Sequence, residues 1–321
     1  MTLATRILLL AAACLLAAPA FAQSWPARPV RIIVPFPPGG GVDFVARLLA
    51  QGLSEQLGSG FVVDNRPGAA GMLGSEAAAR AAPDGYTLLI TPPEVAIDPS
   101  IRAKLPYDPL KDFVTISQLT SGQFMLAASP SVPVKTVPEL IALAKAKPGQ
   151  LNYGHSGTGS INHLKGELLQ SMTGIRWENV PFKGAGPAIG AVMSGDIQFV
   201  FASVTGLVSL AKSGKVRAIA VSGNKRFAEL PDVPTIGESV PGYVVTGWYG
   251  LFAPAGTPAE IVRRLQAEAA KALTTPEAKD KLVRSGNEPV VSSPEEFNAF
   301  LRAEIAKWAK VIQTSGLKKI D

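Results

Sequence analysis

The sequence contains almost none of the residues that build covalent cross-links or metal sites. Its 321 residues include one cysteine, Cys14, and two histidines, His155 and His163. Cys14 lies in a leader that we expect to be removed, so the mature chain should have no disulfide, no thiol catalysis and no cysteine-built zinc site. No carboxylate at helical spacing from the histidines completes a recognised metal set, so we predict neither a metal nor another cofactor.

Residues 1–22 are predicted to be a secretory signal peptide, so we expect the mature protein to be exported. Arg6 supplies the basic start, an apolar run extends over residues 7–18, and Ala20-Phe21-Ala22 is a small-x-small cleavage site. The apolar run is too short to span a bilayer comfortably. Lipidation of Cys14 is the alternative, but the residue three positions before it is alanine rather than the large aliphatic residue of a lipoprotein signal.

The sequence also lacks runs of one charge and any later long apolar stretch. Lysine and arginine number 31 against 25 acidic residues, for a net charge of +6, and the positive residues are scattered without interleaved aromatics. We therefore expect no nucleic-acid partner. No later segment is apolar over about 18 residues, which predicts a soluble mature protein. The length favours two domains, and an apolar fraction of 47% is enough for a large core.

What the sequence does contain is a regular alternation of strand and helix patterns. Such alternation is typical of α/β layers with mostly parallel strands. The proline-rich stretch 92–109 is predicted to contain neither. Strands are expected at residues 31–35, 61–64, 87–91, 113–119, 124–129, 152–153, 177–181, 199–201 and 217–221, and helices at 43–57, 71–82, 140–145, 161–172, 187–194, 207–212 and 294–314.

The first functional signal is a glycine-rich turn between the strand at 31–35 and the helix that follows it. Gly39, Gly40 and Gly41 leave backbone N–H groups uncovered, and the positive end of a helix dipole lies behind them. Such a turn can hold an anion without a charged side chain. We interpret it as one half of an anion-binding site.

A second turn of the same kind precedes the helix at 161–172. It reads Ser156-Gly157-Thr158-Gly159-Ser160 and adds three hydroxyls to its backbone N–H groups. His163 lies roughly opposite the apolar stripe of that helix, so we do not expect it in the core. Two anion-accepting turns, one in each half, suit a solute held between two lobes. The alternative is that both turns are merely tight connections.

Enzymatic interpretations are weaker. Gly154-His155-Ser156-Gly157-Thr158 begins like a nucleophile elbow but has Thr158 in the last glycine position. A serine triad also needs a base from elsewhere in the fold, whereas both histidines lie in this turn and helix start, and no orienting acid is evident. A hydrolase that uses His155, Ser156 and Ser160 stays as a minor alternative to a binding protein that is not an enzyme.

Several further motifs carry a resemblance to a known family. They follow one another in the order expected and cover essentially the whole mature chain. The sequence resembles the extracytoplasmic solute receptors of tripartite tricarboxylate transporters, also called Bug-type receptors. The motifs are residues 34–43, 63–71, 82–88, 151–154, 180–184, 230–235 and 248–254.

The resemblance implies a two-lobed periplasmic binding protein of the Venus flytrap, type II-like class, in which each lobe is a mostly parallel sheet flanked by helices. Lobe 1 would combine residues 23–122 and 246–321, and lobe 2 would hold 123–245. Members of the family capture small carboxylates, through main-chain groups and bridging waters, and pass them to membrane permease subunits. We expect a monomer. A ligand-presenting subunit of a carboxylate-sensing system is the alternative, and only the partner separates the two.

The family's contact positions map onto both turns and their neighbourhood. Asp43 has an alternative role as a cap of its helix. The implied ligand-binding residues are Phe36, Gly39, Gly40, Gly41 and Asp43 in lobe 1, and His155, Ser156, Gly157, Thr158, Gly159, Ser160, His163, Phe182, Lys183, Gly184, Ala202 and Ser203 in lobe 2.

Four of these positions depart from the family pattern. His155 stands where a small residue is usual, and could reach the far end of the ligand or narrow the cleft. Phe182 replaces a common tyrosine, Ala202 stands where a Phe-Asp pair is common, and Ser203 replaces a frequent asparagine. Phe182 and Ala202 suggest a less polar wall, which favours an aromatic or aliphatic monocarboxylate over an amino acid.

Overall fold

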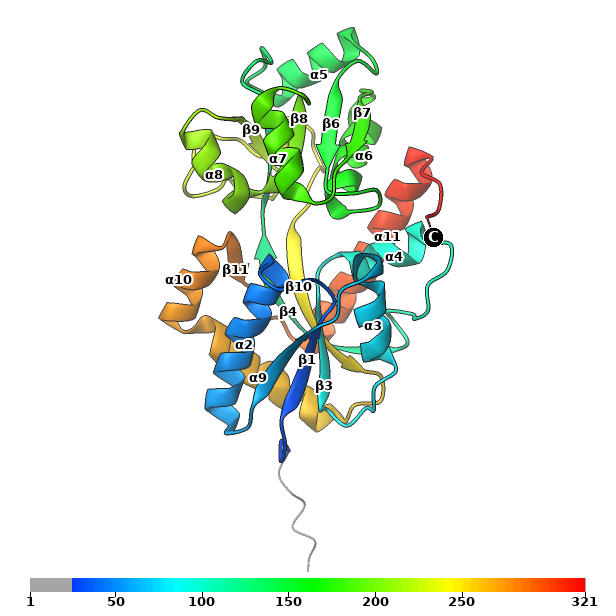
Figure 1. Cartoon of the computed structure of the whole chain (residues 1–321), viewed down its shortest axis with the longest axis vertical. Coiled ribbons are helices and arrows are strands. Elements are labelled where there is room, and N and C mark those ends of the chain that lie inside the picture. The colour runs from blue at the N-terminus through cyan, green and yellow to red at the C-terminus, as the bar shows by residue number, and fades with distance from the viewer. Residues whose placement is uncertain (1–24, 321) are drawn as a thin grey trace, which may run out of the picture.

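The computed structural model describes residues 25–320 as two α/β lobes, one above the other along the longest axis (Figure 1). This confirms the predicted fold class. The predicted signal peptide, residues 1–22, lies outside the described residues. Among the helices of the described part, none is both long and apolar enough to cross a membrane.

The lower lobe in Figure 1 is built on a six-stranded sheet in the order β11-β4-β10-β3-β1-β2. It is formed by both ends of the described chain. Its elements are β1 (Val30–Val34), α2 (Gly41–Leu57), β2 (Phe61–Asn65), η1 (Ala69–Gly71), α3 (Met72–Ala79), β3 (Thr87–Thr91), α4 (Glu94–Ile101), β4 (Phe113–Gly122), β10 (Gly247–Pro254), α9 (Ala259–Thr274), α10 (Pro276–Arg284), β11 (Asn287–Pro289) and α11 (Pro294–Ser315).

The upper lobe is built on a five-stranded sheet in the order β7-β6-β8-β5-β9. It uses the middle of the chain without interruption. Its elements are β5 (Phe124–Ala128), α5 (Val137–Ala146), β6 (Asn152–His155), α6 (Ile161–Thr173), β7 (Glu178–Pro181), α7 (Ala185–Ser194), β8 (Phe199–Ser203), α8 (Val204–Lys212), β9 (Arg217–Val221) and η2 (Ile236–Glu238).

The sheets are mixed rather than mostly parallel, which corrects one part of the prediction. β1 runs parallel to β2 and β3, and β6 runs parallel to β7 and β8. The strands that connect the lobes reverse direction: β10 is antiparallel to β3 and β4, and β5 is antiparallel to β8 and β9. A chain that leaves a lobe and later returns enters the sheet from the opposite end, so the alternation pattern along the sequence could not reveal these pairings.

The inner strand β1 shows why a continuous apolar run forms a central strand here. Val30, Ile32 and Val34 pack into one core cluster with α2 and α9, while Ile33 packs into a second cluster on the other face. All four are fully buried. A strand covered on both faces needs no polar alternation, and its short apolar run is typical of parallel α/β sheets.

The lobes are joined where β4 and β10 pair. β4 ends at Gly122 and β5 begins at Phe124, so a single residue separates a strand of one sheet from a strand of the other. Gly122 is paired with Gly247 at the start of β10, the returning crossing. A side chain at Gly247 would lie 3.0 Å from the ring of Phe124, so glycine lets the two crossings approach each other.

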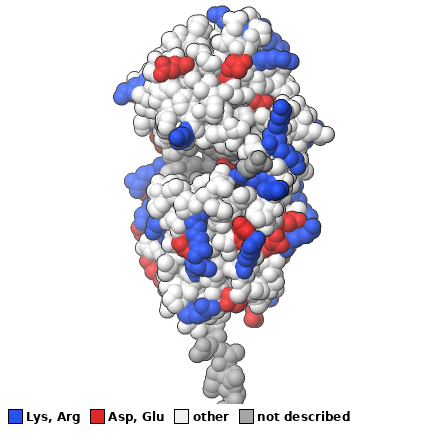
Figure 2. All heavy atoms as spheres, turned by 45° about the vertical axis from the view of Figure 1, so that its right-hand side comes forward, with Lys and Arg blue, Asp and Glu red and all other residues white. Residues whose placement is uncertain are grey.

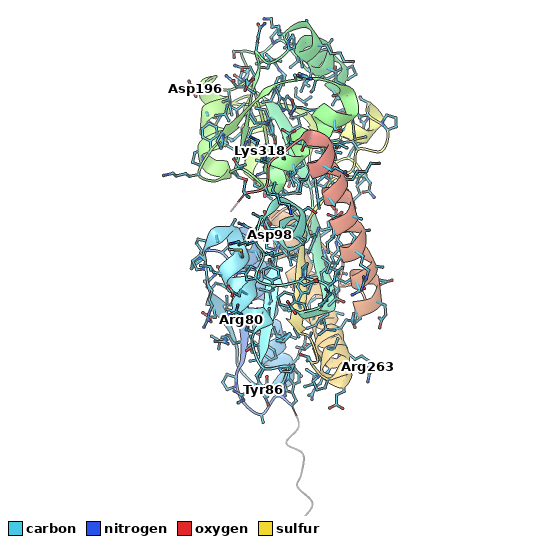
Figure 3. All side chains as sticks on the ribbon, turned by 90° about the vertical axis from the view of Figure 1, so that its right-hand side faces the viewer. Arg80, Tyr86, Asp98, Asp196, Arg263 and Lys318 are labelled. Carbon is cyan, nitrogen blue, oxygen red and sulfur yellow. The ribbon has the colours of Figure 1, made fainter. Side chains whose placement is uncertain are left out.

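Helix α11 contacts elements of both lobes. It packs against α4 of the lower lobe and α6 of the upper lobe, and in Figure 3 it runs upward along one side of the molecule past the junction. Beyond it, the backbone of Ile320 hydrogen-bonds with Ile101 and Ala103. A Cβ on Gly159, whose φ is +80°, would lie 3.0 Å from Ile320, so the C-terminal segment supports the second glycine-rich turn from behind.

Helix α4 was missed by the sequence analysis, which assigned no element to the stretch 92–109. Pro99 lies inside this helix and removes one backbone donor, which normally argues against a helix. The helix forms because Val95, Ala96, Ile97 and Ile101 are all buried in the same core cluster, with α11 packed against it. Tertiary packing outweighs the local propensity here.

Asp98 and Arg102 form a buried ion pair one turn apart on α4. Arg102 Nε donates to Asp98 Oδ1 at 2.8 Å, and Arg102 also donates to the carbonyl of Ala69. Both side chains are 5% exposed. Burial raises the pKa of Asp98, and the guanidinium of Arg102 opposes that rise.

Replacing Arg102 by leucine should lower the free energy of unfolding by about 3–5 kcal/mol, because Asp98 is left as an unpaired buried charge. Adding Asp98→Asn should recover part of the loss. Urea unfolding measures both. The matched control is Arg80→Leu, directly after α3, where the arginine pairs with Glu76 but is 72% exposed, and where we expect a loss of at most about 1 kcal/mol (Figure 3). Equal losses of unfolding free energy in Arg80→Leu and Arg102→Leu would contradict the stabilising role given to the buried Asp98–Arg102 pair.

Candidate ligand-binding site

A cleft of about 760 Å³ lies between the lobes and is lined by residues of both. Figure 2 shows the surface hollowed at this level. The lining comes from the first residues of five helices, α2, α4, α6, α7 and α8, together with the crossing strands around Gly122 and Gly247 and the loop before β11. The carboxyl ends of β1 and β3 in one lobe, and of β6 and β8 in the other, therefore open into it, as expected for ligand sites in parallel sheets.

The first glycine-rich turn lies in this lining as predicted. Phe36, Gly39, Gly40 and Gly41 all face the cleft. Gly39 has a φ of +87°, which favours glycine, and its N–H is already used by the carboxylate of Asp43 at 2.9 Å. The first N–H groups of α2, from Gly41 onward, have no partner within the helix and are free for a ligand.

Asp43 holds the turn from behind rather than lining the cleft. Its side chain accepts hydrogen bonds from the Gly39 N–H, from Arg47 Nε and from Asn65 Nδ2, each at 2.9 Å. It is 3% exposed. Burial raises the pKa of Asp43, but the bonds from Arg47, Gly39 and Asn65 outweigh it and lower the pKa overall. The N-cap of α2 is Gly40, without a side-chain cap bond, so Asp43 does not cap the helix but fixes the turn that precedes it.

The second turn is organised around two stacked histidines. The rings of His155 and His163 lie 4.3 Å apart, centre to centre, and are 1% and 3% exposed. Nδ1 of His155 accepts the N–H of Gly157 at 3.3 Å, and Nδ1 of His163 accepts the N–H of Gly159 at 3.1 Å. The expectation that His163 lies outside the core is therefore wrong: it is buried because it binds the turn.

Both buried histidines resist protonation. Burial lowers the pKa of His155, and burial together with the neighbouring ring of His155 lowers the pKa of His163 to about 4. Glu167 lies four residues after His163, with its Oε1 3.6 Å from His163 Nε2. The sequence analysis overlooked this carboxylate at helical spacing. Burial raises its pKa, while bonds from Asn179 and Gln170 oppose the rise.

The part of the second lobe that faces the cleft is accordingly smaller than predicted. Ser156, Gly184 and Ser203 line it. Ala202 is 1% exposed and lies in the core of the upper lobe, with Phe182 packed against that core. The argument for a less polar wall loses its support, because neither residue is part of the lining. The predicted residues outside the lining are Asp43, His155, Gly157, Thr158, Gly159, Ser160, His163, Phe182, Lys183 and Ala202.

The serines of the second turn are engaged with groups other than histidine rings. Ser156 Oγ accepts from Asn162 Nδ2 at 3.0 Å, and Ser160 Oγ caps α6 by accepting the N–H of His163 at 3.2 Å. Within residues 25–320 no hydrogen bond joins a serine hydroxyl to either imidazole. The arrangement does not provide the activated nucleophile of a hydrolase.

Sequence reasoning missed several cleft residues. Glu94 follows β3, at a strand end where ligand contacts are expected. Gln123 connects β4 to β5 and Tyr249 lies on β10, at the crossings between the lobes, whose meeting no local pattern shows. Lys165 does not line the cleft but lies behind its wall; it could have been noticed, because it falls on the apolar face of α6 with Ile161, and it is fully buried.

The electrostatics of the cleft come from the backbone. Among the described residues that line it, Glu94 is the one Asp, Glu, Lys or Arg. Five helix N-termini converge on the cleft, and each carries a partial positive charge. Such a site favours a small anion without an arginine or lysine.

A second hollow, of about 840 Å³, has the opposite character. It lies outside the cleft, between the end of α6 at Gly174 and the end of α11 at Thr314 and Ser315. Helix C-termini carry partial negative charge. With Glu167, Glu178 and a single arginine, Arg176, also in its lining, this hollow favours an anion less than the cleft does.

Comparison with known proteins identifies the family. The sequence model described as the tripartite tricarboxylate transporter family receptor matches residues 45–317. The chain belongs to this receptor family. It is similar to protein BugT of Bordetella pertussis, with 35% identity over 306 residues, 94% of each chain.

Solved receptors of the family share the two-lobed architecture. A periplasmic binding protein named BugD is 31% identical, with a TM-score of 0.79 over 92% of this chain and 100% of that one. An R. palustris protein solved with adipate is 36% identical, with a TM-score of 0.82 over 92% of this chain and 100% of that one. MatC from Rhodopseudomonas palustris, solved with bound malate, is 33% identical, with a TM-score of 0.78 over 90% of this chain and 100% of that one.

In this receptor, Gly41 should not tolerate a side chain. A Cβ at Gly41 would collide with the hydroxyl of Tyr249. We expect Gly41→Ala to lower the free energy of unfolding by about 1–3 kcal/mol through overpacking, and to displace a tyrosine of the cleft wall. Adding Tyr249→Phe removes the colliding atom and should restore most of the stability in urea unfolding. Failure of the double variant to recover would count against this contact.

Titration of His163 should make the receptor less stable in acid. The unfolded chain protonates this histidine near its ordinary pKa of 6.5 and the folded chain only near 4. Stability should therefore fall as the pH drops from about 6.5 to about 4, by about 3 kcal/mol. His163→Asn keeps an acceptor for the Gly159 N–H and removes the titration. Urea unfolding across this range should give a difference between wild type and variant that changes with pH, and a constant difference would contradict the assignment.

Proposed function

We propose that this receptor binds a small organic carboxylate in the cleft between its lobes and delivers it to the permease subunits of a tripartite tricarboxylate-type transporter. It acts in the periplasm after removal of residues 1–22, as a monomer and without enzymatic turnover. Residues 23–122 with 246–321 and residues 123–245 are the two units that close on the ligand. Ser156, Gly184, Ser203 and residues 36–41 contact the ligand.

One observation carries the proposal: five helix N-termini point into one cleft that contains no arginine or lysine. A carboxylate needs several hydrogen-bond donors and a positive potential, and helix ends supply both. The family and the carboxylates named with two of its solved members agree with this chemistry. Ordered water between ligand and backbone would let the same frame accept acids of different length.

Closure of the lobes would transmit occupancy to the transporter. The cleft draws its donors from both lobes, so a carboxylate can reach donors of α2 and α6 together only when the lobes are close. Contacts that exist in one conformation and not in the other are what allow a ligand to shift the equilibrium between them. A permease that recognises the closed form would then select the loaded receptor.

Short carboxylates should stabilise the purified receptor, and their primary amides should not. At a ligand concentration near a thousand times Kd the stabilisation should be about 4 kcal/mol, seen as a rise in the thermal unfolding midpoint. The screen should be repeated after unfolding, dialysis and refolding, so that a ligand retained from purification is removed. If no acid raises the midpoint of the refolded protein, or if amides do so equally, the proposed function is wrong.

A further inference from the structure

Glu94 is an acidic side chain placed among helix N-termini. It is the first residue of α4, directly after Pro92 and Pro93, and it lines the cleft. Its Oε2 is buried, and no group among residues 25–320 hydrogen-bonds to it. Ile161 and Asn162, the first residues of α6, line the same cleft, so the starts of α4 and α6 belong to one wall. Glu94 of the lower lobe therefore shares this wall with the anion-accepting turn of the upper lobe.

The surroundings of Glu94 make its charge state sensitive to pH near neutrality. Burial raises its pKa to about 7, Asp98 on the same helix adds to the rise, and Lys165 on α6 opposes it. Tyr249 on β10 also faces it, and the charge of Glu94 contributes to the raised pKa of that phenol. Close to neutral pH, Glu94 thus changes between a carboxylic acid and a carboxylate.

Lys165 lies behind the cleft wall and does not reach the ligand space. It is fully buried, and its Nζ lies 2.7 Å from the ring centroid of Phe124, which forms the wall. No hydrogen-bond acceptor contacts Nζ within the described residues. Burial lowers the pKa of Lys165, and the charge of Glu94 opposes this. The group presented to a ligand is therefore the carboxyl of Glu94.

Two further acceptors lie in the same wall without a partner. Asn162 is 7% exposed, donates through Nδ2 to Ser156, and leaves its Oδ1 unpaired within the described part of the chain. Gln123, between β4 and β5, likewise has a buried Oε1 with no partner in that part of the chain. Buried acceptors without partners are costly and are normally satisfied by a ligand or water. All three residues line the cleft, so donors of a bound ligand are the natural partners of these acceptors.

We propose that Glu94 determines specificity: the receptor takes a monocarboxylate whose other end carries a hydrogen-bond donor, a hydroxyl or an amine, and it rejects dicarboxylates. The inference rests on the proposed function and narrows its substrate class. The ligand carboxylate binds the free helix N–H groups, and the donor end binds Glu94 Oε2 with Asn162 and Gln123. This proposal replaces the expectation, drawn from Phe182 and Ala202, that the far end of the ligand is apolar.

The physical reason is the cost of placing two carboxylates together in a poorly hydrated cleft. A second ligand carboxylate beside Glu94 is either repelled or requires Glu94 to be protonated. Above the pKa of about 7, that requirement weakens binding by up to about tenfold per pH unit. A hydroxyl or ammonium group instead donates to the ionised carboxylate, which is the stronger kind of hydrogen bond.

Calorimetry can test this with short linear acids of matched length that end in a methyl, hydroxyl, ammonium or second carboxylate group. For the wild type at pH 8, an acid with a donor end should bind at least about tenfold more tightly than the matched dicarboxylate. The dicarboxylate should gain affinity on going to pH 6, whereas the hydroxyl-ended acid should not.

Glu94→Gln keeps the size of the side chain and removes its charge. This variant should bind the dicarboxylate more tightly than wild type at pH 8, without the pH dependence, and should lose about tenfold for the donor-ended acid. Glu94→Asp keeps the charge and should keep the rejection of dicarboxylates. Glu55→Gln, at an exposed position on α2, is the matched control and should behave like wild type.

The outcomes separate the two proposals. If no carboxylate of any kind binds, the proposed function fails and this inference fails with it. The receptor function stands and the role of Glu94 is overturned if carboxylates bind but wild type prefers dicarboxylates at pH 8. The same holds if Glu94→Gln changes the affinity for all the acids by the same factor.

Discussion

The pairing of β4 with β10 is the constraint on which the rest of this structure depends. At Gly122 and Gly247 the two crossings of the chain lie side by side, and the upper sheet begins one residue later at Phe124. This junction forms the floor of the cleft and brings the helix N-termini of both lobes to the same space. It also explains the mixed sheets, because the strands that cross are those that run against their neighbours.

Because the cleft uses backbone donors, the side chains around it mainly hold the backbone in place. Asp43 fixes the first turn, and His155 with His163 fixes the second. These three side chains are buried and lie outside the cleft lining, although the resemblance had placed them among the ligand contacts. A binding site made of peptide groups needs such support, since peptide N–H groups bind only where the turn conformation presents them. Glu94 is the exception, because it lines the cleft and carries a carboxyl without a hydrogen-bond partner on Oε2 among residues 25–320.

Local sequence patterns predicted the structure accurately where a single turn or helix determines it. The glycines at 39–41 lie in the cleft lining, and the helices after both turns form close to their expected bounds. The predictions were wrong where contacts with distant segments of the chain determine the structure. Helix α4 forms in spite of Pro99 because α11 and the core cover it, and His163 is buried although its position on the helix predicted exposure. Ala202 and Phe182 were assigned to the ligand wall, but Ala202 on β8 is buried in the core of the upper lobe and Phe182, directly after β7, packs against that core.

The sequence by itself determined the alternation of strands and helices, the two glycine-rich turns and the family, because each is written in residues close together in the chain. Only the tertiary structure decided which of the candidate residues face the cleft. Glu94, Gln123 and Asn162 come from three separate segments and meet in one wall. Their meeting depends on the crossing of the chain between two sheets and on burial from both lobes, and no local spacing along the chain encodes either.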